Sequence, residues 1–272
     1  MTLNKNTKNE TIKEQLNHQL TEVANNWDIS GSVFVLQKND TLYEKSFGFS
    51  DRDKGLQTTS QSRYLLHSES EFFTALSIFL LIDQNRLKLS DKLAKYIPEY
   101  PLCGGITIKH LINSNSGIPD FFYNCLMVAF DQDPEYKALD DIARIPVEKK
   151  AYYENSNFQA VLSLIKSLPL EYKPGTKDMT PSQSNSIFLA EIVRRITGGS
   201  VFDFLDAHLF SSLQMHSVQQ GDQADTVSYT VFRETTLVRL PLDYFVKGLI
   251  TVTLDDMKKL LARSEERRVG KE

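Results

Sequence analysis

The sequence predicts an α+β fold, in which an antiparallel sheet is flanked by helices and a helical lobe is inserted into the chain. Segments 30–37 and 41–49 are rich in β-branched and aromatic residues, and a short polar turn separates them, which is typical of a β-hairpin. Residues 72–82 are nearly all apolar, a run too long for an ordinary strand and long enough for a buried helix. Strands followed by a helix-rich region are typical of the α+β class.

Helical spacing of apolar residues supports the same organisation. Residues 10–25 carry apolar side chains three or four positions apart, which predicts an amphipathic opening helix. Further helical patterns cover 93–97, 108–112, 158–168 and 187–196, with proline-bearing segments between several of them. The helices therefore concentrate in the middle of the chain.

Length and charge exclude several classes of function. The 272 residues suit one large domain or two closely joined lobes. With 31 basic and 35 acidic side chains the net charge is −4, so we expect no nucleic-acid partner. No run approaches the roughly 20 apolar residues of a membrane span. The first twenty residues lack the apolar region of a secretion signal, which predicts a cytoplasmic protein and leaves open an export signal already removed.

The cysteines give no sign of a metal centre. Cys103 and Cys125 are the only two, and neither a C-x-x-C motif nor a Cys/His ligand spacing is present. We therefore expect no metal and no cofactor, and two free thiols rather than a disulfide.

Six segments, in order along the chain, carry a family resemblance. They are SGSVFVLQKNDTLYEKSFGFSD (30–51), SESEFFTA (68–75), RLKLSDKLAKYIPEYP (86–101), ITIKHLINSNSGIPDF (106–121), PLEYKPGTK (169–177) and FVKGLITVTLDDMKKLL (245–261). In this order they resemble the serine β-lactamase and penicillin-binding-protein superfamily, in particular its class C β-lactamase-related serine hydrolases. The resemblance implies one domain over 8–262, with 72–240 as a mainly helical lobe. It also implies hydrolysis of a small-molecule amide or ester through an acyl-serine intermediate.

A serine hydroxyl becomes a good nucleophile only when a neighbouring base takes its proton. In the serine hydrolases that this chain resembles, a lysine one helical turn after the serine and a tyrosine of a Y-x-N loop supply the base and relay the proton. Here Ser68 stands at the nucleophile position and Glu71 at the lysine position. The second-motif loop aligns as either Pro181-Ser182-Gln183 or Gln183-Ser184-Asn185, so Gln183 and Asn185 are the candidates there. No tyrosine occurs between Tyr172 and Tyr229.

Ser68 also has a structural interpretation, which we favour. Ser68-x-x-Glu71 directly before an apolar helix is the sequence signature of a capping box, and this interpretation accounts for both residues. As a general base, a carboxylate with a pKa near ~4.3 is weak unless burial raises that pKa.

The end of the chain departs from the family further. No K-T-G or H-x-G, the family's third motif, follows residue 216, and the family-like text stops at Leu261. Residues 263–272 are highly charged, which suggests a frayed tail or, as we prefer, a non-native segment. We therefore expect the final strands to be missing and the 30–49 hairpin to lack partners.

Two further motifs resemble catalytic groups but have simpler explanations. Ser163-x-x-Lys166 lies inside a helical pattern and is read as a chance match. Asp255-Asp256 begins a predicted helix, where acids are favoured by the helix dipole. Together these observations predict a catalytically impaired serine hydrolase. The alternatives are a non-catalytic pseudoenzyme that binds a small ligand or a protein, and a non-functional gene fragment.

Overall fold

The computed structural model describes residues 5–37, 40–66, 70–177, 181–221, 224–227, 229–232, 236–239 and 250–269. The chain forms two compact units. The first, called here the sheet unit, consists of Met1–Leu66, Leu209–Leu242 and Gly248–Glu272. The second, the helical unit, consists of His67–His208 and Asp243–Lys247. Mixed helices and antiparallel strands confirm the predicted α+β class.

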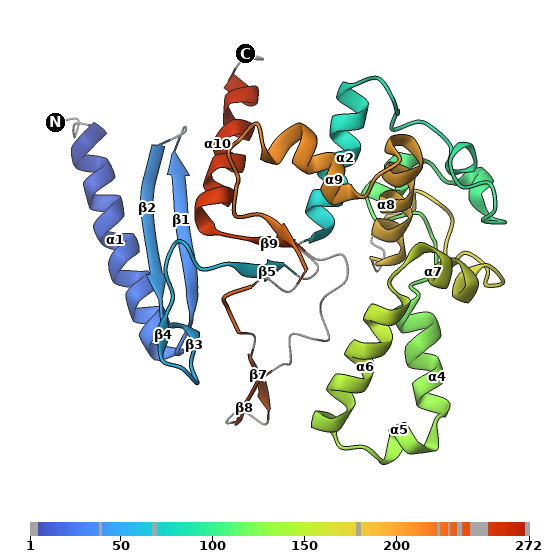
Figure 1. Ribbon diagram of the computed structural model, residues 1–272, viewed down its shortest axis with the longest axis horizontal. Helices are drawn as coiled ribbons and strands as arrows, with labels where there is room; N and C mark the ends of the chain where they lie inside the picture. The colour runs from blue at the N-terminus through green and yellow to red at the C-terminus, as the bar shows by residue number, and fades with distance from the viewer. Residues whose placement is uncertain are drawn as a thin grey trace. The chain divides into compact units, whose positions relative to one another are not determined.

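The predicted opening helix and hairpin form one side of the sheet unit. Helix α1 (Lys5–Asn26) is longer at both ends than the predicted 10–25. Strands β1 (Gly31–Gln37) and β2 (Asp40–Phe47) pair antiparallel, with a bulge between Val35 and Leu36. In Figure 1, α1 runs along β2, and α10 (Leu254–Val269) lies beside β1, in agreement with their contacts. The hairpin is therefore packed against a helix on each strand.

The other described strands of the sheet unit are short and pair antiparallel. The remaining strands are β3 (Phe49–Asp51), β4 (Leu56–Gln57), β5 (Tyr64–Leu66), β6 (Gln219–Gln220), β7 (Tyr229–Phe232), β8 (Thr236–Arg239) and β9 (Ile250–Val252). Strand β9 is the centre of a three-stranded sheet of order β5-β9-β6, in which Tyr64 lies opposite Val252. All three side chains of β9 are buried. This sheet therefore joins the segment before the helical unit to segments that follow it.

The helical unit is built around two helices. Helix α2 (Ser70–Asp83) packs against α8 (Ser184–Thr197), and α3 (Ile108–Ile112), α7 (Phe158–Ile165) and α9 (Val201–Leu205) pack against one or both of them. The other elements are η1 (Leu93–Lys95), η2 (Cys103–Gly105), η3 (Phe122–Leu126), α4 (Met127–Gln132), α5 (Pro134–Ala138), α6 (Asp141–Asn155) and η4 (Asp206–Phe210), the last of which ends in the sheet unit. The helix predicted over 72–82 is confirmed, and it is buried on one face: Phe73, Ile78 and Leu81 are buried, whereas Phe72 and Phe79 are 48% and 46% exposed.

A single apolar cluster holds α2 and α8 together. Ile78 of α2 and Phe188 of α8 are fully buried in it, and the Phe188 ring meets Tyr100 and Phe158 edge-on, each at 5.3 Å between ring centroids. Each fully buried side chain of this kind contributes about 1.5–3 kcal/mol. Helix α8 ends at Gly198, whose φ of +83° is the left-handed C-terminal conformation that favours glycine. The core thus fixes α2 and α8 relative to each other.

The structure differs from the predicted elements in three places. The helix predicted over 93–97 is only the 3₁₀ turn η1, because Pro98 cannot continue it. The main segment of the helical unit ends at His208, whereas the predicted lobe ran over 72–240: residues 229–232 and 236–239, rich in Tyr, Thr and Val, form strands instead. Helix α10 extends to Val269 and includes the first part of the charged segment 263–272.

Candidate functional site

The predicted nucleophile, Ser68, lies outside the described residues. Glu71 is described, and it lies in the first turn of α2, half-buried. The Ser186 side chain, in the first turn of α8, hydrogen-bonds with its carboxyl group. The side chain at position 71 therefore places a carboxyl group against the start of α8, where the family resemblance implies the amine of a lysine.

Burial raises the pKa of Glu71, because the charged form loses solvation. The hydrogen bond from Ser186 lowers that pKa, and the neighbouring carboxylate of Asp120 raises it. The net shift is upward, which is the direction that brings a carboxyl group closer to the range of a useful general base. No cation of the described chain is among the groups that shift the Glu71 pKa.

Asp120, which sequence reasoning missed, anchors two helical segments at this place. Its Oδ1 accepts hydrogen bonds from the backbone N–H groups of Phe122 and Tyr123, each at 2.9 Å. Its Oδ2 accepts one from the backbone N–H of Gln183 at 2.6 Å. Three backbone N–H donors bind the side chain of Asp120, which is 5% exposed. Asp120 therefore joins the start of η3 to the start of α8.

The two candidates of the second-motif loop have different surroundings. Gln183 is the residue before α8, and its side-chain oxygen accepts a hydrogen bond from the Tyr152 hydroxyl of α6. Asn185 is buried: its Nδ2 donates to the Ser182 carbonyl at 2.8 Å, and its Oδ1 accepts from the Ser116 hydroxyl at 2.5 Å. The Gln183 side chain thus contacts a tyrosine hydroxyl, whereas the Asn185 side chain hydrogen-bonds with two buried serine residues.

Ser186 joins Gln183 to Glu71. Its hydroxyl donates to the Gln183 backbone carbonyl at 2.9 Å and is also the hydrogen-bonding partner of Glu71. Of the predicted site residues that are described, Glu71 and Gln183 are therefore brought together, and Asn185 is directed elsewhere. Asp120 belongs to the matched segment 106–121 and could have been suspected from it. Tyr152 and Ser186 carry no sequence signal of a role here.

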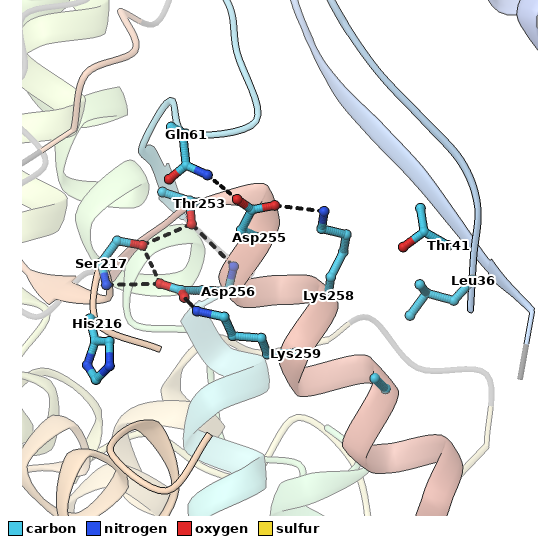
Figure 2. Close-up of a pocket in the computed structure, with 11 residues that line it drawn as sticks. Leu36, Thr41, Gln61, His216, Ser217, Thr253, Asp255, Asp256, Lys258 and Lys259 are labelled. Carbon is cyan, nitrogen blue, oxygen red and sulfur yellow. Dashed lines mark hydrogen bonds and ion pairs between the residues drawn. The ribbon is translucent and has the colours of Figure 1, made fainter. Parts of the chain in front are cut away.

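A cavity of about 470 Å³ lies in the sheet unit. Residues of the hairpin, of α10 and of the segments before β5 and β6 line it (Figure 2). Asp256, which is 2% exposed, accepts from the Ser217 backbone N–H at 3.0 Å and from Lys259 Nζ at 2.9 Å. Its own backbone N–H donates to Thr253 Oγ1, which caps α10. Asp255 pairs with Lys258 at 2.7 Å. The Asp255-Asp256 pair is therefore engaged in the start of α10, as a structural role requires.

Other motifs singled out from the sequence lie apart from this network. Ser163 and Lys166 are exposed at the end of α7. Cys103 and Cys125 are free thiols, as predicted. In the part of the chain that the structure describes, no group of three or more His, Cys, Asp or Glu side chains could hold a metal ion. No helix among the described residues is long and apolar enough to cross a membrane.

Comparison with known proteins gives relatives of one kind. The chain is 25% identical over 224 residues to Protein flp of Staphylococcus aureus strain MW2, covering 78% of this chain and 40% of that protein. It is 23% identical over 245 residues to a teichoic acid D-alanine hydrolase of S. aureus strain MRSA252, covering 87% of this chain and 54% of the relative. The chain thus spans about half, or less, of the length of these relatives.

A solved structure shows the same fold. The octameric penicillin-binding protein homologue from Pyrococcus abyssi superposes with a TM-score of 0.72 at 21% identity, covering 93% of this chain and 56% of that one. The profile of the Beta-lactamase family matches residues 21–272, nearly the whole sequence. The resemblance inferred from six short segments is thereby confirmed, and the chain belongs to the Beta-lactamase family.

Proposed function

We propose that this chain is a β-lactamase-related serine hydrolase whose site is catalytically impaired, within a domain of residues 8–262. Ser68 is the proposed nucleophile position, and Glu71 occupies the position of the base. The observation that carries the proposal is the environment of Glu71, whose carboxyl group meets the Ser186 side chain and lies near the Asp120 carboxylate. A carboxyl group among such neighbours differs in charge and proton affinity from the amine that the family resemblance implies.

The chemical consequence is a large loss of rate. When the Ser68 oxygen attacks a carbonyl carbon, its proton must pass to a base at the same time. A nucleophile and its base act as a unit, so replacing one member costs several orders of magnitude. The second-motif loop adds no tyrosine of its own, since none occurs between Tyr172 and Tyr229. We therefore expect binding of family-type ligands with negligible turnover.

The ligand class follows from the family and its named relatives. A small amide or ester is the proposed ligand, because one relative is a teichoic acid D-alanine hydrolase and another is Penicillin-binding protein 4* of Bacillus subtilis, 37% identical over 92 residues. Binding without turnover, to a small ligand or to a protein, would make the chain a pseudoenzyme.

A second candidate function is favoured by one observation, the raised pKa of Glu71. A carboxylate of raised pKa accepts a proton more readily, so Glu71 could serve as the base of a slow hydrolase. In that case the proton of the Ser68 hydroxyl passes to the Glu71 carboxylate as the serine oxygen bonds to the carbonyl carbon. It is then delivered to the departing nitrogen or oxygen.

Hydrolysis of a chromogenic cephalosporin and of p-nitrophenyl esters tests both candidates. The impaired-site proposal expects the native chain and its Ser68→Ala variant to give the same rate, close to that of buffer. A rate well above buffer that Ser68→Ala removes would contradict it. If Glu71→Gln also removed that rate, Glu71 would be the base of a slow hydrolase. If Glu71→Gln left the rate unchanged, the carboxylate candidate would fail as well.

A further inference from the structure

We propose that Tyr152 and Gln183 form a positioning pair for Glu71, in which a phenol from α6 fixes the residue that precedes α8 and thereby directs the Ser186 hydroxyl. This inference rests on the proposed function in taking Glu71 as the carboxyl group of the site. It assigns roles to Tyr152 and Ser186, which lie outside the matched motifs, and it concerns positioning, since neither residue is placed against a substrate.

The Tyr152 ring is held rigidly. It packs against Phe121 at 5.3 Å, against Phe122 at 5.4 Å and against Tyr153 at 4.9 Å between ring centroids. Aromatic contacts at such distances stabilise the ring beyond its burial. The ring cannot easily turn away, so its hydroxyl stays at the side-chain oxygen of Gln183.

Gln183 is held from three directions. Its side-chain oxygen accepts from Tyr152, its backbone N–H donates to Asp120, and its backbone carbonyl accepts from Ser186. The Gln183 carbonyl lies three residues before Ser186 in the chain, and these contacts hold it in a fixed position relative to the Ser186 hydroxyl. Loss of the Tyr152 contact would release one of these three constraints.

Ser186 has one hydroxyl hydrogen and two neighbours that can accept it. One acceptor is the Gln183 carbonyl, and the other is Glu71 in its charged form. When Glu71 is ionised, donation to the carboxylate is favoured, because hydrogen bonds to charged acceptors are stronger. When Glu71 is protonated, it can donate to the Ser186 oxygen while Ser186 donates to Gln183. The position of Gln183 thus affects which state of Glu71 is supported.

The other titratable groups near Glu71 do not replace this arrangement. The Asp120 side chain is bound by three backbone N–H groups. Burial, and then the neighbouring Tyr153, Glu71 and Asp120, raise the pKa of Tyr152 far above neutral, so its hydroxyl remains a proton donor. Tyr152 can therefore hold Gln183 over the whole pH range in which Glu71 titrates.

Carbon-13 NMR of glutamate labelled at the side-chain carboxyl tests the proposal without any need for turnover. Glu71→Gln identifies the Glu71 signal, whose titration midpoint is then followed in the full chain. Tyr152→Phe removes one hydroxyl and keeps the ring. We expect the midpoint to fall, since a loosened Gln183 carbonyl competes less for the Ser186 hydrogen, which is then free to donate to the charged carboxylate. Tyr153→Phe, a neighbouring half-buried tyrosine of the same helix, is the matched control and should leave the midpoint unchanged.

Two further variants separate positioning from a general loss of structure. Ser186→Ala should raise the midpoint by itself, and the double variant Tyr152→Phe/Ser186→Ala should match Ser186→Ala alone, because the phenol acts through Ser186. Gln183→Met keeps the length of the side chain without the acceptor and should reproduce the effect of Tyr152→Phe. Should Tyr152→Phe unfold the chain, Gln183→Met carries the test.

An unchanged midpoint in both Tyr152→Phe and Gln183→Met would overturn the proposal. The proposal would also be overturned if the shifts in the Glu71 midpoint caused by Tyr152→Phe and by Ser186→Ala were simply additive in the double variant. Hydrolysis by the native chain is measured separately, so a failure of the proposed function would be seen in the rate and a failure of this inference in the titration.

Discussion

The Tyr152 hydroxyl donates a hydrogen bond to the side-chain oxygen of Gln183, which joins α6 to the start of α8. Because α2 packs against α8, this contact lies at the same end of the helical unit as Glu71. The candidate site thus places a phenol, an amide and a hydroxyl next to the carboxyl group of Glu71, with the Asp120 side chain nearby. Its behaviour should depend chiefly on the protonation of that carboxyl group.

The first prediction concerns pH. The pKa of Glu71 is raised in the folded chain above its ordinary value of 4.5, so the folded chain binds the proton more tightly than the unfolded chain does. Its contribution to the free energy of unfolding is therefore fully present below pH 4.5 and is lost as the pH rises through the folded pKa. Glu71→Gln should be more stable than the native chain at pH 7, with a difference that disappears under acid conditions. Urea unfolding of both proteins from pH 4 to pH 8 measures this, and a difference independent of pH would contradict it.

The second prediction concerns the buried pair Ser116 and Asn185. Their side chains hydrogen-bond at 2.5 Å, and both residues are almost fully buried. Ser116→Ala leaves the amide without this partner, which should lower the free energy of unfolding by about 1–3 kcal/mol. Ser163→Ala, at an exposed position of α7, should change it by less than about 0.5 kcal/mol. Equal effects of the two substitutions in urea unfolding would refute the structural role of Ser116.

The third prediction concerns the start of α10. Asp256 is buried against Ser217 and Lys259, whereas Asp255 is about one-third exposed. Asp256→Ala should cost about 2–3 kcal/mol, because it leaves buried donors without their acceptor. Asp255→Ala should cost less than about 1 kcal/mol, since exposed ion pairs contribute little. Thermal unfolding of the two variants compares them directly, and a larger loss for Asp255→Ala would reverse the assignment.

The fourth prediction concerns rescue. Glu71→Lys restores the residue that the family resemblance implies, but the segment between Tyr172 and Tyr229 still contains no tyrosine. We expect the rate of p-nitrophenyl ester hydrolysis to stay within a few-fold of buffer, because catalytic groups that act as a unit are not restored singly. A Ser68-dependent rate in the Glu71→Lys variant would show that the remaining residues suffice.

Patterns local in the sequence predicted much of the fold. The hairpin β1–β2 and the helix α2 follow from residue type and periodicity within a few residues. Strands β7 and β8 were missed inside the predicted helical lobe, since each has only four residues and their pairing is a tertiary property. The pairing of β5 with β9 joins residues far apart in the chain, which no local pattern reveals.

The candidate site was predictable only where it coincides with a motif. Glu71 and Gln183 were found because matched segments pointed to their positions. Tyr152 could not be found in this way, because α6 reaches Gln183 through packing of its ring with Phe121 and Phe122. The upward shift in the pKa of Glu71 likewise depends on burial, which the sequence alone does not give.

Covalent labelling of the native chain determines whether the carboxyl group at position 71 leaves the site impaired. The protein is incubated with a fluorescent penicillin and its intact mass is measured, with Ser68→Ala as the control. We expect no mass increase and no fluorescence above that of Ser68→Ala, because the serine lacks an effective base. A stoichiometric mass increase that maps to Ser68 and is absent from Ser68→Ala would contradict it.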